Sequence, residues 1–331
     1  MSLSNLTANQ HFLSRTEQQL NALNPDAQPA NQRIYSFSLL DREAHRIQLD
    51  NPRGKSISNN LSLRDLFSFS VVDGDKTRLN LETLFGQYEA DIKTNTLELL
   101  RKLGSGEQDI KTEILELFVS KFMNFLRNPY SIQKVLNTIG GLLQYHPTDP
   151  ELLAQYHAVL AGRKPHQEYL CQQLGIDATT YRDWLAVLFM ALFRPSPDVP
   201  NLLEGIIKEV LESRSHHAQV AVFQYIGEHA DKRCSLCDRG FINLLQDSQG
   251  LSFSFNLNSN AFICYTFFDI DQFAVGKVHP SVIELFKAQP KNIQVHLLTN
   301  NLEALSTYNR NVVYQCARGV YCSSKSVYGI P

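Results

Sequence analysis

The sequence predicts an α+β fold within a single large domain that spans residues 1–331. Residues 1–76 mix helical and strand signals, residues 77–215 carry helical signals, and residues 216–331 are rich in strand signals and close with a helix. Strands grouped on either side of a helical block favour antiparallel pairing, because a doubly wound parallel sheet needs strands and helices in alternation. With 43% hydrophobic and 19% charged residues, the chain has ample apolar material for a core.

The first block predicts a short helix followed by a strand hairpin. Ser14 and Glu17 have capping-box spacing, so we expect a helix from Ser14 to about Leu23. Residues 33–37 and 45–49 alternate polar and apolar side chains, which is typical of half-buried strands. We therefore expect these two segments to pair as an N-terminal hairpin.

The second block predicts a series of helices over about residues 79–213. Apolar residues recur there at the 3.6-residue spacing of one helix face. The first such face consists of Leu81, Leu84, Phe85, Tyr88, Ile92, Leu99, Leu100 and Leu103. Ser105 is expected to cap a second helix, which ends at Asn128 before a proline. Asp177 and Asn201 are expected to cap two further helices.

The third block predicts strands and a closing helix. Residues 220–226 are a candidate buried strand, and the alternating segments 251–257 and 261–268 predict a β-hairpin. Residues 293–298 are a further strand candidate, and residues 300–303 are expected to cap the closing helix. We therefore expect an antiparallel, β-rich C-terminal region.

Nothing in the sequence predicts a membrane or secretory protein. The longest apolar run, residues 185–193, has nine residues, well short of the roughly 20 that cross a bilayer. The polar N-terminus lacks the basic and apolar regions of a signal peptide. We therefore expect a cytoplasmic protein without membrane partners, in which the six cysteines are reduced thiols.

The net charge of −2 does not by itself demand nucleic acid, but the charges are unevenly distributed. Residues 31–64 carry six Arg and Lys against three acids, and residues 291–331 carry four against one. Residues 82–116 reverse the balance, with eight acids against four bases. Two interpretations stay open: the basic segments meet and form a basic face, or all these charges are solvated surface.

The strongest chemical signal is a Cys-x2-Cys pair formed by Cys234 and Cys237. A structural zinc site takes four ligands, usually as two pairs, and no second pair follows. The favoured interpretation is two small side chains entering a turn without a metal, and zinc at Cys234 and Cys237 is kept as the alternative. The sequence lacks the phosphate-binding, nucleophile-elbow and His-Glu-x2-His motifs of common nucleotide-binding and hydrolase folds, and it identifies no cofactor.

Separated segments of the chain together resemble one family of proteins. They are residues 9–15, residues 33–37, residues 235–241 and the helix that begins at Asn301. In that order they are similar to an opening His-aromatic-Val-Pro-Gln-x-Tyr-Leu signature, an Ile-Tyr-x-Tyr/Phe strand, a late Thr-Ser-Asp-Asn-Pro-Val segment and an Asn-led helix. The family they resemble is functionally uncharacterised, occurs in bacteria and fungi, and would cover nearly the whole chain.

Within these segments, His11 and Asp238 match the family's His and Asp. Cys237 stands where Ser is usual, and Gly240 replaces a proline. Asn301 or Asn300 matches the residue that leads the closing helix, and Asn301 is the candidate site residue. The resemblance implies an α+β fold, and the family's association with bacterial defence and toxin loci implies an effector or accessory role.

The first functional hypothesis is an effector enzyme, a nuclease-like hydrolase of an anti-phage defence or toxin locus. His11 would act as acid or base, Asp238 as metal ligand or orienting carboxylate, and Asn301 would complete the catalytic set. Phosphate or substrate would be held by three arginines: Arg15, Arg33 and Arg239. The expected partner is nucleic acid or a protein of the same locus. The hypothesis requires His11 and Asp238 to converge within a few ångströms.

The second hypothesis is a non-catalytic binding or scaffolding subunit. Asp238 would then bond backbone amides in a turn, His11 would satisfy a buried carbonyl, and Asn301 would cap a helix. The acidic face of the helical block would be the partner surface. The sequence leaves both hypotheses open, and the surroundings of His11 and Asp238 discriminate between them.

Overall fold

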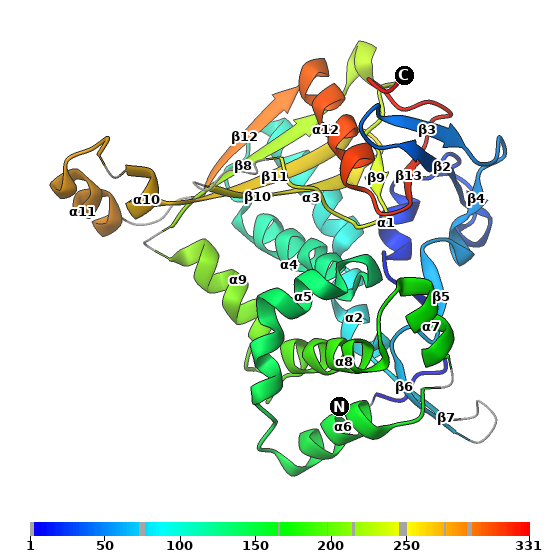
Figure 1. The fold of residues 1–331 in the computed structure, drawn as a ribbon. Coiled ribbons are helices and arrows are strands. Elements are labelled where there is room, and N and C mark those ends of the chain that lie inside the picture. Colours follow the sequence, from blue (N-terminus) through cyan, green and yellow to red (C-terminus); the bar gives the residue numbers. More distant parts are fainter. Residues whose placement is uncertain are drawn as a thin grey trace.

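The computed structural model has the α+β architecture that the sequence predicts (Figure 1). Helices α2 to α9 form the helical block, which follows the N-terminal strands and precedes the β-rich C-terminal region. The structure describes residues 3–72, 77–164, 166–196, 198–213, 216–244, 250–274, 276–289 and 293–331.

The secondary-structure elements have the following bounds. The helices are α1 (Arg15–Gln19), α2 (Glu82–Glu89), α3 (Ile92–Ser105), α4 (Lys111–Arg127), α5 (Ile132–Ile139), α6 (Pro150–Ala161), α7 (Gln167–Leu174), α8 (Ala178–Leu192), α9 (Leu202–Glu212), α10 (Ile270–Ala274), α11 (Pro280–Ala288) and α12 (Leu302–Gln315). The strands are β1 (Asn9–His11), β2 (Arg33–Asp41), β3 (Arg46–Leu49), β4 (Lys55–Ser56), β5 (Ser62–Arg64), β6 (Ser68–Val72), β7 (Thr77–Asn80), β8 (His216–Gln224), β9 (Leu236–Cys237), β10 (Gly250–Asn258), β11 (Ala261–Asp269), β12 (Gln294–Thr299) and β13 (Gly319–Cys322).

A four-stranded sheet in the order β10-β11-β8-β12 forms most of the C-terminal region. Its β10–β11 hairpin is the one predicted from alternation, with Phe253 opposite Tyr265. β8 pairs antiparallel with β11, whereas β12 pairs parallel with β8. The antiparallel expectation therefore fails only for β12, because the chain leaves the sheet through α10 and α11 before β12 returns alongside β8 (Figure 1).

A second sheet, in the order β3-β2-β13-β9, joins the two ends of the chain. β2 and β3 form the predicted N-terminal hairpin, and β13 lies between β2 and β9, antiparallel to both. The basic segments 31–64 and 291–331 therefore do meet in space. Some of their charges are already paired, since Arg46 contacts Asp41 at 3.1 Å and Lys55 contacts Asp50 at 2.7 Å.

The main core lies between the helical block and the four-stranded sheet. The apolar run expected from the sequence forms the buried second half of α8, and the indole N–H of Trp184 donates to the Leu126 carbonyl at 2.8 Å. Phe118 of α4 meets four rings of the sheet: Phe253, Phe255, Tyr265 and Phe267. A second core cluster packs α12 against the β2-β13-β9 sheet.

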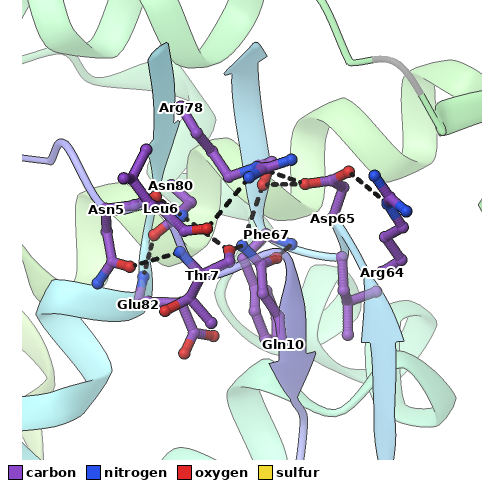
Figure 2. A network of polar contacts seen from close by, with 12 residues as sticks. Asn5, Leu6, Thr7, Gln10, Arg64, Asp65, Phe67, Arg78, Asn80 and Glu82 are labelled. Atoms are coloured by element: carbon purple, nitrogen blue, oxygen red, sulfur yellow. Dashed lines mark hydrogen bonds and ion pairs between the residues drawn. The ribbon is translucent and has the colours of Figure 1, made fainter. Parts of the chain in front are cut away.

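A buried polar network ties the N-terminal segment to the β6–β7 pair (Figure 2). The Arg78 guanidinium donates to Asp65 at 2.8 Å and to the Leu6 carbonyl at 3.1 Å. Gln10, inside the opening signature, accepts from the Phe67 N–H at 2.5 Å. Asp65 and Arg78 are almost fully buried. Each compensates the charge of the other, which would be costly to bury alone.

Two expected helix boundaries are wrong. Ser105 does not cap a second helix but is the last residue of α3, which ends because Gly106 adopts the left-handed conformation with φ 77°. α4 begins later, after Ile110, without a side-chain cap. The N-terminal helix starts after Ser14 as expected but stops at Gln19, since the Leu23 N–H bonds the Arg33 carbonyl.

Candidate functional site

Asp238 lies at the turn that follows β9, directly beside the segment between α12 and β13. Its carboxylate accepts three backbone N–H groups, from Ala317 at 2.8 Å, Arg318 at 2.6 Å and Gly319 at 3.0 Å. The Asp238 carbonyl accepts from Asn128 at 2.8 Å. Asp238 is 1% exposed, so this one residue connects three segments of the chain in the interior.

Burial is the main influence on the ionisation of Asp238. Burial raises the pKa of Asp238 above its ordinary value, because it penalises the charged form. The three backbone N–H donors lower the same pKa, because they favour the carboxylate. The acceptor capacity of the carboxylate is largely used by these donors, so it has little left for an external ligand.

The sequence allows this turn because of Gly240. That residue adopts φ 78°, and a Cβ atom there would lie 2.7 Å from the Cβ of Asn124 on α4. Only glycine combines the left-handed conformation with so close an approach of neighbouring atoms. Gly240, which replaces the proline of the resembled motif, therefore lets the turn carrying Asp238 pack against α4.

Cys234 and Cys237 are fully buried thiols beside this turn. The Cys237 sulfur lies 3.7 Å from Asp238 Oδ1, in position to donate a weak hydrogen bond. Burial raises the pKa of both thiols well above the ordinary value, and the neighbouring Asp238 raises that of Cys237 further. Among the residues that the structure describes, no three His, Cys, Asp or Glu side chains gather closely enough to hold a metal ion.

His11 is buried at the end of β1. Its Nε2 lies 3.4 Å from the Ile57 carbonyl. Burial, followed by the charge of Arg15, lowers the pKa of His11 to about 4. The imidazole is therefore neutral near pH 7 and faces a backbone carbonyl.

Asn301 lies at the N-cap of α12. Its side-chain oxygen accepts the Ala304 N–H at 3.0 Å, and its carbonyl accepts the Tyr225 hydroxyl at 2.9 Å. These bonds satisfy a free helix amide and attach the helix start to the end of β8. The side-chain oxygen and the backbone carbonyl of Asn301 therefore both have structural hydrogen-bond partners.

The three candidate arginines lie in different places. Arg33 donates to the Arg53 carbonyl at 2.7 Å and the Gly54 carbonyl at 2.5 Å, so it fixes a backbone loop. Arg15 is exposed at the start of α1. Arg239 is half-buried beside Asp238, and its Nε finds no hydrogen-bond partner among the described residues.

A polar pocket of about 260 Å³ lies where three of the resembled segments meet. Phe12, Phe37 and Asp238 come from these segments and all line it. Its other polar lining residues are Ser38, Asp50, Lys55, Ser62, Tyr130, Arg318 and Tyr321. His11, the neighbour of Phe12, is not among the lining residues, and neither are Asn301 and the three candidate arginines.

The cations of this pocket are partly engaged. Lys55 pairs with Asp50, which also accepts hydroxyl groups from Ser36 at 2.8 Å and Ser38 at 2.6 Å. The Arg318 guanidinium lies 5.4 Å from the ring centre of Tyr130 and donates to a backbone carbonyl on α7. Both cations remain exposed on one side, so they can still meet an anion.

A second groove, of about 280 Å³, lies on the helical block. Leu115, Val119 and Tyr88 supply apolar surface, and Asp91 and Glu116 are exposed acids at its border. The remaining charges of the groove are Arg194 and Glu204, which pair with each other at 2.5 Å. Neither Asp91 nor Glu116 has a basic partner in the described part of the chain, so the groove carries net negative charge.

Sequence reasoning missed the buried ion pair of α1 and α4. Lys121 is fully buried and donates to Glu17 at 2.5 Å and to the Asn256 carbonyl at 2.7 Å. Asn124 adds a further bond to Glu17 at 2.5 Å. A signal was available, because Lys121 interrupts an otherwise apolar helix face between Phe118 and residue 125.

Comparisons of the chain with protein-family models, with curated proteins and with solved structures find no match. The geometry of this chain is therefore the basis for its proposed function. Within the described ranges, no helix combines the length and apolar character that a bilayer crossing needs.

Proposed function

We propose that the protein is a non-catalytic binding subunit that holds a partner protein through its helical block. The observation that carries the proposal is the commitment of Asp238, whose buried carboxylate accepts three backbone N–H groups. His11 faces a backbone carbonyl and Asn301 caps a helix. Each of the three candidate catalytic residues thus has a role in holding the fold.

The groove on the helical block indicates which chemical properties the partner has. Its apolar surface is bordered by Asp91 and Glu116, which no basic side chain neutralises among the described residues. A partner segment with one or two apolar side chains flanked by Lys or Arg would complement both features. The proposed partner is therefore a basic, amphipathic segment of another protein.

Site-specific photo-crosslinking tests this proposal. A photoreactive amino acid at Gln87, an exposed groove residue, is expected to capture one protein in extracts of the natural host, whereas the same group at Lys134 on α5 does not. The captured protein is then purified and its affinity measured by calorimetry. Asp91→Lys with Glu116→Lys is expected to weaken binding by roughly tenfold or more.

The matched control is Glu43→Lys with Glu228→Lys, which makes the same charge change at exposed residues that do not line the groove. It is expected to bind like the wild type. Equal weakening by both double variants would remove the groove from the proposal. Cleavage of nucleic acid by the wild type, lost in folded His11→Ala and Asp238→Ala variants, would replace the binding subunit with an enzyme.

The effector enzyme acting on nucleic acid is the second candidate. One observation favours it: Asp238, Lys55 and Arg318 line the same polar pocket, where a phosphate could meet two cations. His11 does not line that pocket, so the acid or base of the original hypothesis would have to be another residue. The defence-locus association stays an expectation from the resemblance.

A further inference from the structure

The C-terminal sheet has an open edge at β12. The strand order is β10-β11-β8-β12, so β12 pairs only with β8 among the residues that the structure describes. Figure 1 shows β12 as the outermost strand on this side of the sheet. An edge of this kind presents backbone N–H and C=O groups that a further strand can bond.

The backbone groups that point outward can be identified. The Asn300 N–H donates to the Gln224 carbonyl at 2.9 Å, so the backbone of residue 300 points toward β8. Backbone groups of successive residues in a strand alternate between its two sides. The N–H and C=O groups of Val295, Leu297 and Thr299 therefore point away from β8.

β12 lacks the features that normally block an edge strand. Its sequence, Gln-Val-His-Leu-Leu-Thr, contains no charge and no proline, and its register with β8 has no bulge. Leu298 is 40% exposed. The opposite edge differs, because β10 has a bulge near Asn256 and forms a bridge through Ser254 to Ile242.

We propose that β12 pairs antiparallel with β12 of a second copy of this chain, which joins two four-stranded sheets across a two-fold axis. The register is centred on Leu297, which lies opposite Leu297 of the second copy. Val295 then lies opposite Thr299 of the second copy. Within the strand, this is the symmetric register that pairs all three outward residues.

A second copy suits this edge better than an unrelated strand for two reasons. An uncharged strand brings no like charges together when it meets its own copy. The register places His296 beside Leu298 of the second copy, so the exposed leucine becomes covered.

None of the residues that line the acidic groove lies on β12, so the test of this interface is independent of the proposed binding function. Analytical ultracentrifugation of the full chain at micromolar to 100 micromolar concentration is expected to give a dimer of twice 37.6 kDa. Leu297→Pro removes an N–H that points away from β8 and has no hydrogen-bond partner among the described residues, and edge strands tolerate proline there. Its dimer is expected to dissociate at least roughly tenfold more readily, with a circular dichroism spectrum like that of the wild type.

Lysine substitution supplies a second variant with a matched control. Leu298→Lys places a charge within the interface and is expected to give monomers, even if the proline variant fails to fold. Leu251→Lys changes an exposed leucine on β10, the opposite edge of the same sheet, and is expected to stay dimeric.

Disulfide formation tests the register itself. His296 and Leu298 of the second copy form a non-hydrogen-bonded pair, whose Cα separation of about 4.5 Å suits a disulfide. The double variant His296→Cys with Leu298→Cys is expected to give a covalent dimer on mild oxidation, whereas each single variant gives much less.

Three results would overturn the proposal. One is a wild type that stays monomeric at 100 micromolar, which would leave the edge to a strand of another protein. Another is a dimer that both the Leu297 and Leu298 variants leave intact, which would place the interface elsewhere. The third is efficient cross-linking by a single cysteine variant, which would indicate a different register.

Discussion

Single residues in this protein show how burial changes the role of a polar side chain from a candidate catalytic group to a structural one. The resemblance predicts Asp238 as a catalytic carboxylate, yet its carboxylate accepts hydrogen bonds from three backbone N–H groups in the interior. His11 is similar, because burial lowers its pKa to about 4 and its ring faces a carbonyl. In both cases the local sequence gives the residue type, and the surrounding elements decide its role.

Glu82 supplies a prediction at this scale. Burial raises the pKa of Glu82 to about 7, and its Oε1 has no hydrogen-bond partner among the described residues. Because the pKa of Glu82 is raised in the folded state, its contribution to the free energy of unfolding is fully present below pH 4.5. That contribution is lost as the pH rises through about 7 and the buried carboxyl ionises. Glu82→Gln is therefore expected to be more stable than the wild type at pH 8 by about 1–3 kcal/mol, with the difference vanishing near pH 4.5.

Urea unfolding at a series of pH values measures this difference. The opposite effect of His11, whose contribution is present above pH 6.5 and lost as the pH falls through about 4, is common to both proteins and cancels. Glu98→Gln, at an exposed ion pair with Arg101, is the control and is expected to change stability little. A Glu82→Gln difference that does not depend on pH would count against the buried carboxyl.

At the scale of elements, buried ion pairs rather than local propensity fix how α1 and α4 meet the sheet. Lys121 bonds Glu17 of α1 and the carbonyl of Asn256 on β10. Removal of one charge from a buried pair leaves the other uncompensated, which costs more than loss of the pair. α1 has only five residues, so its position depends on this contact more than on its own helical stability.

Lys121→Met is therefore expected to destabilise the protein by about 3–5 kcal/mol. The double variant Glu17→Gln with Lys121→Met removes both charges and is expected to recover part of that loss. Denaturant unfolding of the wild type, both single variants and the double variant completes the cycle. Additive single effects would show that the two charges do not interact.

At the scale of the whole molecule, the chain ends share one sheet and the thiols lie inside. β13 near the C-terminus pairs with β2 near the N-terminus. Cys237 of β9 and Cys322 of β13 are buried residues of the same sheet. Of the six cysteines, five are buried and Cys171 is half-buried. Burial raises the pKa of the Cys171 thiol as well, which slows its reaction.

The native protein is therefore expected to react slowly with Ellman's reagent, through Cys171 first, and to react at all six thiols once unfolded. The variant Cys171→Ser is expected to remove the first phase. Rapid reaction at Cys234 or Cys237 in the folded protein, located by mass spectrometry, would show that this turn opens to solvent and would contradict its packing.

The sequence by itself determined the local elements. Alternation predicted the β2–β3 and β10–β11 hairpins, apolar periodicity predicted the helical block, and Ser14, Asp177 and Asn201 begin helices as expected. These features depend on residues that are close together in the chain, so short-range patterns are sufficient to reveal them. The prediction that Ser105 caps a second helix was wrong, because the capping signal of Ser105 competed with the helix-ending signal of Gly106. Gly106 ends α3 directly after Ser105.

Only the tertiary structure decided which distant segments of the chain pair or contact each other. The pairing of β2 with β13, the parallel placement of β12, and the contact of Asp238 with residues 317–319 all link segments far apart in the sequence. No periodicity records such partners, because the energy of these contacts comes from burial and hydrogen bonds that exist only once the chain has folded. For the same reason, the sequence could propose His11 and Asp238 as one site, while the structure gives each a different backbone partner.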